Sequence, residues 1–231
     1  MASASVALLG ISNAIVDVLS QVQPADIEQI GAPPGSMTLI DQEKAVSLYA
    51  SMQNKVESAG GSVANSVACF ASLGGSAAYI GRVAEDELGN AFDADMRKLT
   101  IDMRLPPETR AAPTARSHIM ITPNGERTMQ TFLGACTEIA VSDMTEHTIG
   151  TPVVILLEGY VWDTPEGPAA MARAIELGKL AGARIALSLS DSFCVERHES
   201  AFTTLASGDA DIIIGNEAEM LALFGVNTYS D

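Results

Sequence analysis

The sequence predicts an α/β fold in which a doubly wound, mostly parallel sheet is sandwiched by helices, with a small β-ribbon lid. Two observations lead to this prediction. Short apolar runs alternate with amphipathic segments along most of the chain, which favours a parallel sheet covered on both faces. Several of the apolar runs also lack the apolar-polar alternation of a strand with one solvated face. Two turn-rich stretches interrupt the pattern.

The expected strands and helices follow one another in a regular order. We expect strands in the apolar runs at residues 6–11, 76–83, 153–159, 184–189 and 210–215. We expect helices at residues 62–73, 85–99, 168–181 and 216–224. Pro168 suits the first turn of a helix, and Gly225 suits the residue that ends one.

The two interrupting stretches look like β-ribbons inserted into this scaffold. Residues 13–41 carry VDVLSQV and MTLID around the turn-rich APPGS, and residues 104–133 carry RSHIMIT and RTMQTF around a Pro-Asn-Gly turn. Insertions of this kind often cover a ligand site as a lid. We therefore predict one α/β domain over residues 1–231 with lid insertions at about 13–41 and 104–133.

Composition and charge exclude several classes of function. The chain has 29 acidic and 13 basic side chains and a formal charge of −16, which argues against a nucleic-acid partner. No apolar run approaches the roughly 18 residues of a membrane helix, and the N-terminus lacks the basic region of a signal peptide. The three cysteines are far apart, without a CxxC pair, which suits a reducing compartment. We expect a cytoplasmic protein with no membrane partner.

Two polar segments near the start of the chain are candidates for a ligand site. The segment AGGSVAN joins Gly60 and Gly61 to a helix with Asn65 in its first turns, so that a ligand could approach the backbone and the helix N-terminus. Asn13 and Asp17 follow the first strand, where ligands usually bind in open α/β sheets. The alternatives are a tight loop before a core helix and two turn caps.

Further polar residues lie at predicted strand ends. Glu158 ends one buried run and Asp191 follows another, which suggests a polar crevice or, alternatively, a solvated sheet edge. Asn216 and Glu219 begin the last helix with the spacing of a capping box, a purely structural arrangement. The same spacing could direct Glu219 toward a metal-bound water or a phosphate.

The segment GGSVANSVACFASLGGSAAYIGRVAEDELG resembles the first signature of the ribokinase-like (PfkB) carbohydrate and nucleoside kinases. In that family a Gly-Gly loop, an Asn, a Gly-bearing strand and a D-x-x-G turn recur in this order. The matching residues are Gly60, Gly61, Asn65, Gly81, Asp86 and Gly89. An early Asp after the first strand and an N-x-x-E motif also match, at Asp17, Asn216 and Glu219. The resemblance implies a ribokinase-like fold.

The resemblance also implies an activity, its cofactors and its site residues. Members of the family transfer the γ-phosphoryl group of ATP, with Mg²⁺, to a hydroxyl of a sugar or nucleoside. By the resemblance, Asn216 and Glu219 serve Mg²⁺ and phosphate. Dimerisation through the lid is common in the family, so a homodimer is a further expectation. The substrate-binding positions implied by the resemblance are Asn13, Asp17, Gly60, Gly61, Asn65 and Glu158.

The resemblance places the catalytic Asp outside these residues. The family keeps it in a Gly-Ala-Gly-Asp motif at a helix N-terminus in the last third of the chain, and no such motif occurs among the 231 residues. We therefore expect no catalytic base in this chain and a GAGD Asp after Asp231. The alternative is a non-catalytic remnant that binds a sugar or nucleoside.

The lid sequence favours a class of substrate. The stretches PNGERTMQTFLGAC and LEGYVWD resemble bacterial members described as adenosine kinases or sugar kinases. Arg127 and Phe132 could contact the group attached to the sugar, with Phe132 stacking on a base or instead filling the core face of the ribbon. We expect a nucleoside such as adenosine, with ribose, fructose or 2-keto-3-deoxygluconate as alternatives.

Overall fold

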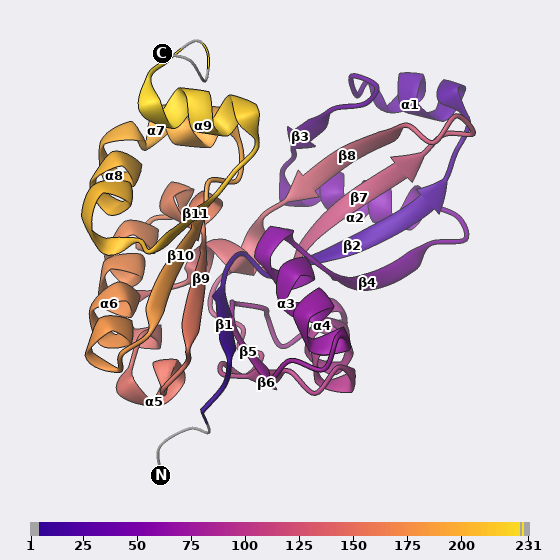
Figure 1. The fold of residues 1–231 in the computed structure, drawn as a ribbon. Helices are drawn as coiled ribbons and strands as arrows, with labels where there is room; N and C mark the ends of the chain where they lie inside the picture. Colours follow the sequence, from indigo (N-terminus) through magenta and orange to yellow (C-terminus); the bar gives the residue numbers. More distant parts are fainter. Residues whose placement is uncertain (1–4, 227, 229–231) are drawn as a thin grey trace.

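The computed structural model describes residues 5–226 and residue 228, and its strands form two sheets (Figure 1). The larger sheet has six strands in the order β11-β10-β9-β1-β5-β6, and each neighbouring pair in it is parallel. Its strands are β1 (Leu8–Ile11), β5 (Ala77–Ile80), β6 (Asp102–Met103), β9 (Val154–Glu158), β10 (Arg184–Ser188) and β11 (Ile212–Ile214). We call it the core sheet.

Helices cover both faces of the core sheet. The described helices are α1 (Pro24–Ile30), α2 (Gln42–Ser51), α3 (Ser62–Ser72), α4 (Glu87–Lys98), α5 (Glu146–Ile149), α6 (Gly167–Leu180), α7 (Ser192–Arg197), α8 (Glu199–Thr204) and α9 (Glu217–Phe224). Short 3₁₀ turns lie at η1 (Gly134–Glu138), η2 (Val141–Asp143) and η3 (Gly159–Asp163), and a π-helical turn, η4 (Leu205–Asp209), follows α8. Among the described residues, none of the helices combines the length and the hydropathy of a membrane span.

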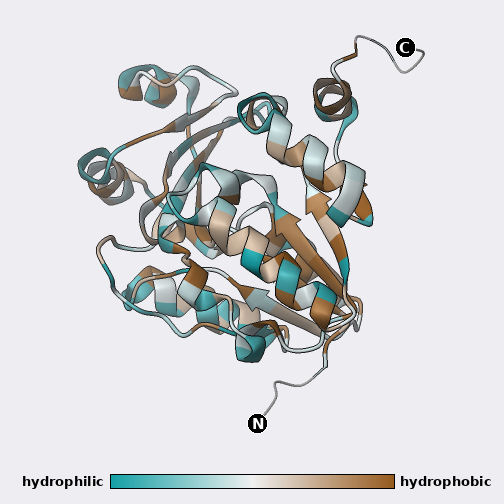
Figure 2. Cartoon of the chain, turned by 90° about the vertical axis from the view of Figure 1, so that its left-hand side faces the viewer, coloured by the Kyte–Doolittle hydropathy of each residue, from teal (hydrophilic) through white to brown (hydrophobic). Residues whose placement is uncertain are grey.

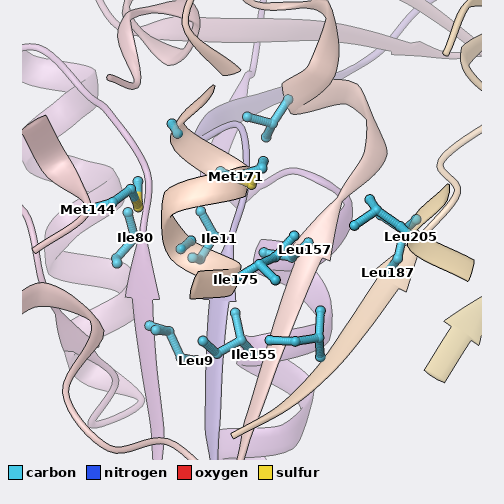
Figure 3. Close-up of a cluster of buried hydrophobic side chains, with 14 of the residues drawn as sticks. Leu9, Ile11, Ile80, Met144, Ile155, Leu157, Met171, Ile175, Leu187 and Leu205 are labelled. Atoms are coloured by element: carbon cyan, nitrogen blue, oxygen red, sulfur yellow. The ribbon is translucent and has the colours of Figure 1, made fainter. Parts of the chain in front are cut away.

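The core strands bury side chains on both faces because successive residues point to opposite sides of a sheet. Leu9, Ile155 and Leu187 pack with α6 in one hydrophobic cluster (Figure 3). Leu156 and Tyr79 belong to a second cluster with residues of α3 and α4. In Figure 2 the strands of this sheet are mostly brown, whereas the helix in front of them carries teal patches. The predicted α/β fold class is confirmed.

The second sheet has five strands in the order β3-β8-β7-β2-β4, and we call it the lid sheet. Its strands are β2 (Ile15–Gln21), β3 (Met37–Leu39), β4 (Val56–Gly60), β7 (Ala115–Ile121) and β8 (Arg127–Phe132). β7 and β8 form an antiparallel hairpin, but β2 pairs with β7 and β3 pairs with β8 in parallel. The sheet is larger than the two ribbons expected from the sequence, because β4 lies outside both stretches.

The two faces of the lid sheet differ. On one face, Val16, Val18 and Met120 join a hydrophobic cluster with Ile27 of α1 and Leu48 of α2. The opposite face, which we call the open face, carries the alternate residues of the same strands, including Asp17. Helices α1 and α2 therefore pack on one face of the lid sheet, whereas the side chain of Asp17 lies on the opposite face.

Candidate functional site

The chain passes from the core sheet to the lid sheet at residues 12–14, between β1 and β2. Asn13 is 5% exposed, and its backbone N–H donates a hydrogen bond to Glu158 Oε2 at 2.7 Å. Its side-chain oxygen Oδ1 is buried and has no hydrogen-bond partner in the described part of the chain. Because a buried polar atom without a partner is costly, this oxygen is a candidate acceptor for a ligand.

The two glycines of the Gly-Gly loop allow close approaches that a side chain would prevent. Gly60 lies opposite Ile15 in the lid sheet, and a Cβ on Gly60 would collide with the carboxyl group of Asp17. Gly61 has φ +100°, and a Cβ there would lie 2.7 Å from the carbonyl oxygen of Asn13. The structure thus brings Asn13, Asp17 and both glycines together.

Asp17 is half-buried on the open face, and within the described chain its carboxylate has no hydrogen-bond partner. Burial raises the pKa of Asp17 to about 6, although the positive charge of Arg127 opposes that shift. Arg127 itself is exposed at the start of β8. The carboxylate is therefore ionised at neutral pH and able to accept hydrogen bonds from a ligand.

The strand register places two neighbouring rows of side chains at the centre of the open face. One row crosses the sheet through Leu39, Thr131, Ser117, Asp17 and Ser58, and the hydroxyl groups of Ser117 and Thr131 lie 2.9 Å apart. The next row is entirely apolar and runs through Met37, Met129, Ile119, Leu19 and Val56. A mostly polar row thus lies beside an apolar one.

Some apolar side chains of the open face are accessible to solvent. Leu39 is 57% exposed, Val56 is 63% exposed and Met37 is 48% exposed. Exposed apolar groups beside an ionised carboxylate suit a ligand that has a hydroxylated part and an apolar part.

The structure places Phe132 on the other face of the lid sheet. It lies opposite Arg116 in the hairpin, and the Arg116 guanidinium is 5.9 Å from the centre of its ring. The same guanidinium lies 5.7 Å from the ring of Tyr49, on α2. The register therefore separates Phe132 from Asp17, and stacking of Phe132 on a base stays a prediction.

Glu158, at the carboxyl end of β9, is 2% exposed. Besides the hydrogen bond from Asn13, its carboxylate is stabilised by the backbone N–H groups of Ser62 and Val63 at the start of α3. Burial is the larger effect and raises the pKa of Glu158 to about 7. The N-terminus of α3, which the sequence offered as a ligand site, thus lies against a carboxylate of the protein itself.

Two residues that the sequence analysis missed form a buried polar pair at the turn between β1 and β2. The hydroxyl groups of Ser12 and Tyr79 are 2.8 Å apart in the buried core. Tyr79 lies in β5, inside an apolar run that gave no functional signal. A polar residue pair at adjacent strand ends could have been found only with the strand order known.

Asn216 and Glu219 form the capping box of α9. The Asn216 backbone N–H donates to Glu219 Oε2 at 3.1 Å, its side-chain Nδ2 donates to Oε1 at 2.7 Å, and the Glu219 N–H donates to Asn216 Oδ1 at 3.0 Å. Asn65 lies exposed on α3. The capping box that the spacing of Asn216 and Glu219 indicated is therefore present, and roles of these two residues in Mg²⁺ or phosphate binding stay predictions.

Other polar groups lie beyond this site. Asp191 accepts a hydrogen bond from the Cys194 N–H at 2.5 Å and so caps α7. A groove of about 540 Å³ lies between α6 and α8 over Trp162. Near it Asp163 and His198 are 2.7 Å apart, and Arg197 also binds Asp163. Because an arginine already occupies this carboxylate, we assign the cluster a structural role.

Comparison with known proteins identifies the family. Residues 35–231 match the pfkB family of carbohydrate kinases. The chain belongs to this family. It superposes on adenosine kinase from Sinorhizobium meliloti with a TM-score of 0.87 and 40% identity, covering 98% of this chain and 70% of that one. It superposes on a probable sugar kinase from Rhizobium etli with a TM-score of 0.86 and 37% identity, covering 97% and 68%.

A curated relative of this pfkB chain is more distant. Fructokinase-1 from Oryza sativa is 26% identical over 181 residues, which are 76% of this chain and 56% of the fructokinase. The chain thus spans little more than half the length of that relative. Members of the pfkB family are phosphotransferases that act on hydroxyl groups of sugars or nucleosides.

Proposed function

We propose that this pfkB chain forms the substrate-binding part of a kinase that phosphorylates a hydroxyl group of an adenosine-like nucleoside. The observation that carries the proposal is the open face of the lid sheet, where the unpartnered carboxylate of Asp17 lies beside an apolar row. A ribose offers hydroxyl groups to Asp17, and a nucleobase offers an apolar face to Leu19 and Met129. A bare sugar would leave the apolar row exposed to water.

In this proposal each residue has a separate task. Asp17 accepts hydrogen bonds from the substrate hydroxyls, and the buried Oδ1 of Asn13 accepts another. Gly60 and Gly61 let the ribose approach the backbone. These contacts fix the acceptor hydroxyl for transfer, because phosphoryl transfer depends on positioning and charge neutralisation more than on covalent chemistry.

ATP and Mg²⁺ belong to the proposal as cofactors. Each oxygen of the Glu219 carboxylate accepts one hydrogen bond from Asn216, so each keeps a lone pair for a magnesium-bound water. This donor set fits Mg²⁺, which retains several waters and uses few protein carboxylates. When bound, the ion would neutralise charge on the transferred phosphoryl group.

The proposal is tested with the product of the complete reading frame. We expect coupled ADP release with adenosine, and kcat/KM for adenosine well above those for ribose, fructose and 2-keto-3-deoxygluconate. Asp17→Asn should abolish turnover, whereas Asp209→Asn, a change at a half-exposed surface carboxylate distant in sequence from the site, should not. Turnover with fructose or ribose but not with any nucleoside would contradict the proposed substrate.

A sugar kinase is the second candidate, supported by the likeness to the Rhizobium etli protein and to Fructokinase-1. A non-catalytic binding protein is the third. Binding of adenosine without ADP release in any nucleoside or sugar assay would favour that third candidate, and calorimetry on the same preparation separates it from a protein that binds nothing.

A further inference from the structure

The carboxylate of Glu158 joins three segments that are distant in the sequence. It lies at the end of β9 and accepts the Asn13 N–H from the turn between the two sheets at 2.7 Å. The N–H groups of Ser62 and Val63, which follow the Gly-Gly loop, stabilise the same carboxylate. One buried side chain therefore contacts both backbone segments that carry the proposed substrate contacts.

The start of α3 depends on this side chain. The residue at its N-cap is Gly61, which has no side chain to accept a hydrogen bond from the first turn. The first N–H groups of a helix need acceptors from outside the helix. Glu158 supplies one, and its negative charge is favourable at a helix N-terminus.

We infer that Glu158 is a positioning residue, which holds the Asn13 turn against the Gly61 end of α3 and so sets the geometry of the proposed substrate site. This inference rests on the proposed function only for the identity of the molecule that fills the pocket. Its structural part rests on the 2.7 Å hydrogen bond from the Asn13 N–H and on the nearby Ser62 and Val63 N–H groups, which stabilise the same carboxylate.

The groups that face Glu158 are neutral near pH 7, so its own titration can be observed. Tyr79 of β5, Cys136 of η1, Tyr160 of η3 and Cys194 of α7 all interact with its charge, and burial raises the pKa of each. Asp17, with a pKa of about 6, is the neighbour that could confuse the measurement. The test therefore uses an Asp17→Asn background.

The test is an NMR pH titration of the 231-residue chain carrying Asp17→Asn, between about pH 5.5 and 8.5, around the pKa of about 7. We expect the backbone amide shifts of Asn13, Ser62 and Val63 to move together with one apparent pKa near that value. Glu158→Gln added to this background should remove that transition, because an amide does not titrate. Three amides with unrelated transitions, or with none, would overturn the inference.

Hydrogen exchange separates positioning from direct substrate contact. In Glu158→Gln we expect exchange at Asn13, Ser62 and Val63 to rise at least about tenfold, because charge-assisted hydrogen bonds are lost. Asp191→Ala, a control that removes the cap of α7, should speed exchange at Cys194 and leave those three amides unchanged. Normal exchange in Glu158→Gln together with lost nucleoside binding would contradict the inference and assign Glu158 to the substrate.

The two proposals can fail separately. If no nucleoside binds, the proposed function is wrong, while the amide titration still tests Glu158. If adenosine binds and the amides do not titrate, the inference alone is wrong. If the Glu158→Gln variant is globally unfolded, the titration of the Asp17→Asn chain still tests the inference, because three amides without a shared transition would overturn it.

Discussion

The core sheet and the lid sheet use their carboxylates differently. At the carboxyl edge of the core sheet, Glu158, Asp191 and Glu219 each accept a hydrogen bond from a backbone N–H group of the protein. On the open face of the lid sheet, Asp17 has no such partner within the described chain. A carboxylate at a strand end can therefore be structural, and the lack of a protein partner is the better sign of a ligand site.

The energetic cost of Asp17 follows from its pKa. The pKa of Asp17 in the folded protein, about 6, lies above its ordinary value of 3.8. The free energy that neutral Asp17 contributes to stability is therefore fully present below pH 3.8 and is lost as the pH rises through 6. At pH 7 the ionised carboxylate therefore costs on the order of 2 to 3 kcal/mol. A bound ligand that donates hydrogen bonds to Asp17 would offset this cost.

The largest expected effect is that of Asp17→Asn, which removes the unpartnered charge from the open face. Adenosine affinity should fall at least about 100-fold, because a charged acceptor is lost. The melting temperature should stay the same or rise, because the cost of the buried charge is removed. Calorimetry and thermal unfolding at neutral pH check both expectations, and a lower melting temperature with normal affinity would assign Asp17 to the fold.

The next effect concerns the Gly-Gly loop. Gly61→Ala should lower the free energy of unfolding by about 3 kcal/mol and weaken adenosine binding, because the new Cβ would meet the Asn13 carbonyl. Gly182→Ala is the matched control, since Gly182 has φ +80° with no atom within 4 Å of the added Cβ. Its cost should be about 1 to 2 kcal/mol. Equal costs in denaturant unfolding would show that the close contact adds no strain of its own.

A smaller effect tests the apolar row. Leu19→Ser should weaken adenosine binding about tenfold and leave ribose binding unchanged, because only the nucleobase covers this row. Leu73→Ser, at a position that is 83% exposed beyond α3, is the control and should change neither affinity. A parallel loss of ribose and adenosine affinity would show that Leu19 supports the sheet and does not select the base.

The smallest effect belongs to the core-sheet edge. Asn216→Ala removes the cap of α9 and should lower the free energy of unfolding by about 1 kcal/mol. Adenosine affinity of the same variant should be unchanged, because Asn216 is assigned to the helix and to the proposed Mg²⁺ site. Urea unfolding and calorimetry measure the two quantities. An unchanged free energy of unfolding would show that the capping box does not stabilise the protein.

The core sheet could be predicted from the sequence because both of its faces are apolar. Its five longer strands fall within the predicted runs, and α3 begins at residue 62 as expected. Strand β4 was missed, because its sequence VESAG lacks an apolar pattern. It is a strand because it pairs with β2. Local sequence does not encode such long-range pairing.

The candidate site was predictable only where it depends on strand ends and on the family resemblance. The meeting of Asp17 with Gly60 followed from the resemblance and from the strand ends, and the structure brings the two residues together. The face on which Phe132 lies depends on the hairpin register with Arg116, which the sequence did not specify. The partners of Glu158 come from two segments that are distant from it in the sequence, so its role could not be found before the fold was known.

The most direct test of the central claim is the pKa of the Asp17 carboxyl, measured by carbon NMR with and without saturating adenosine. The free protein should titrate near the value of about 6. With adenosine bound, hydrogen bonds to the ionised form should lower the pKa by at least about one unit. An unchanged pKa in the presence of bound adenosine would contradict the claim that this carboxylate holds the substrate.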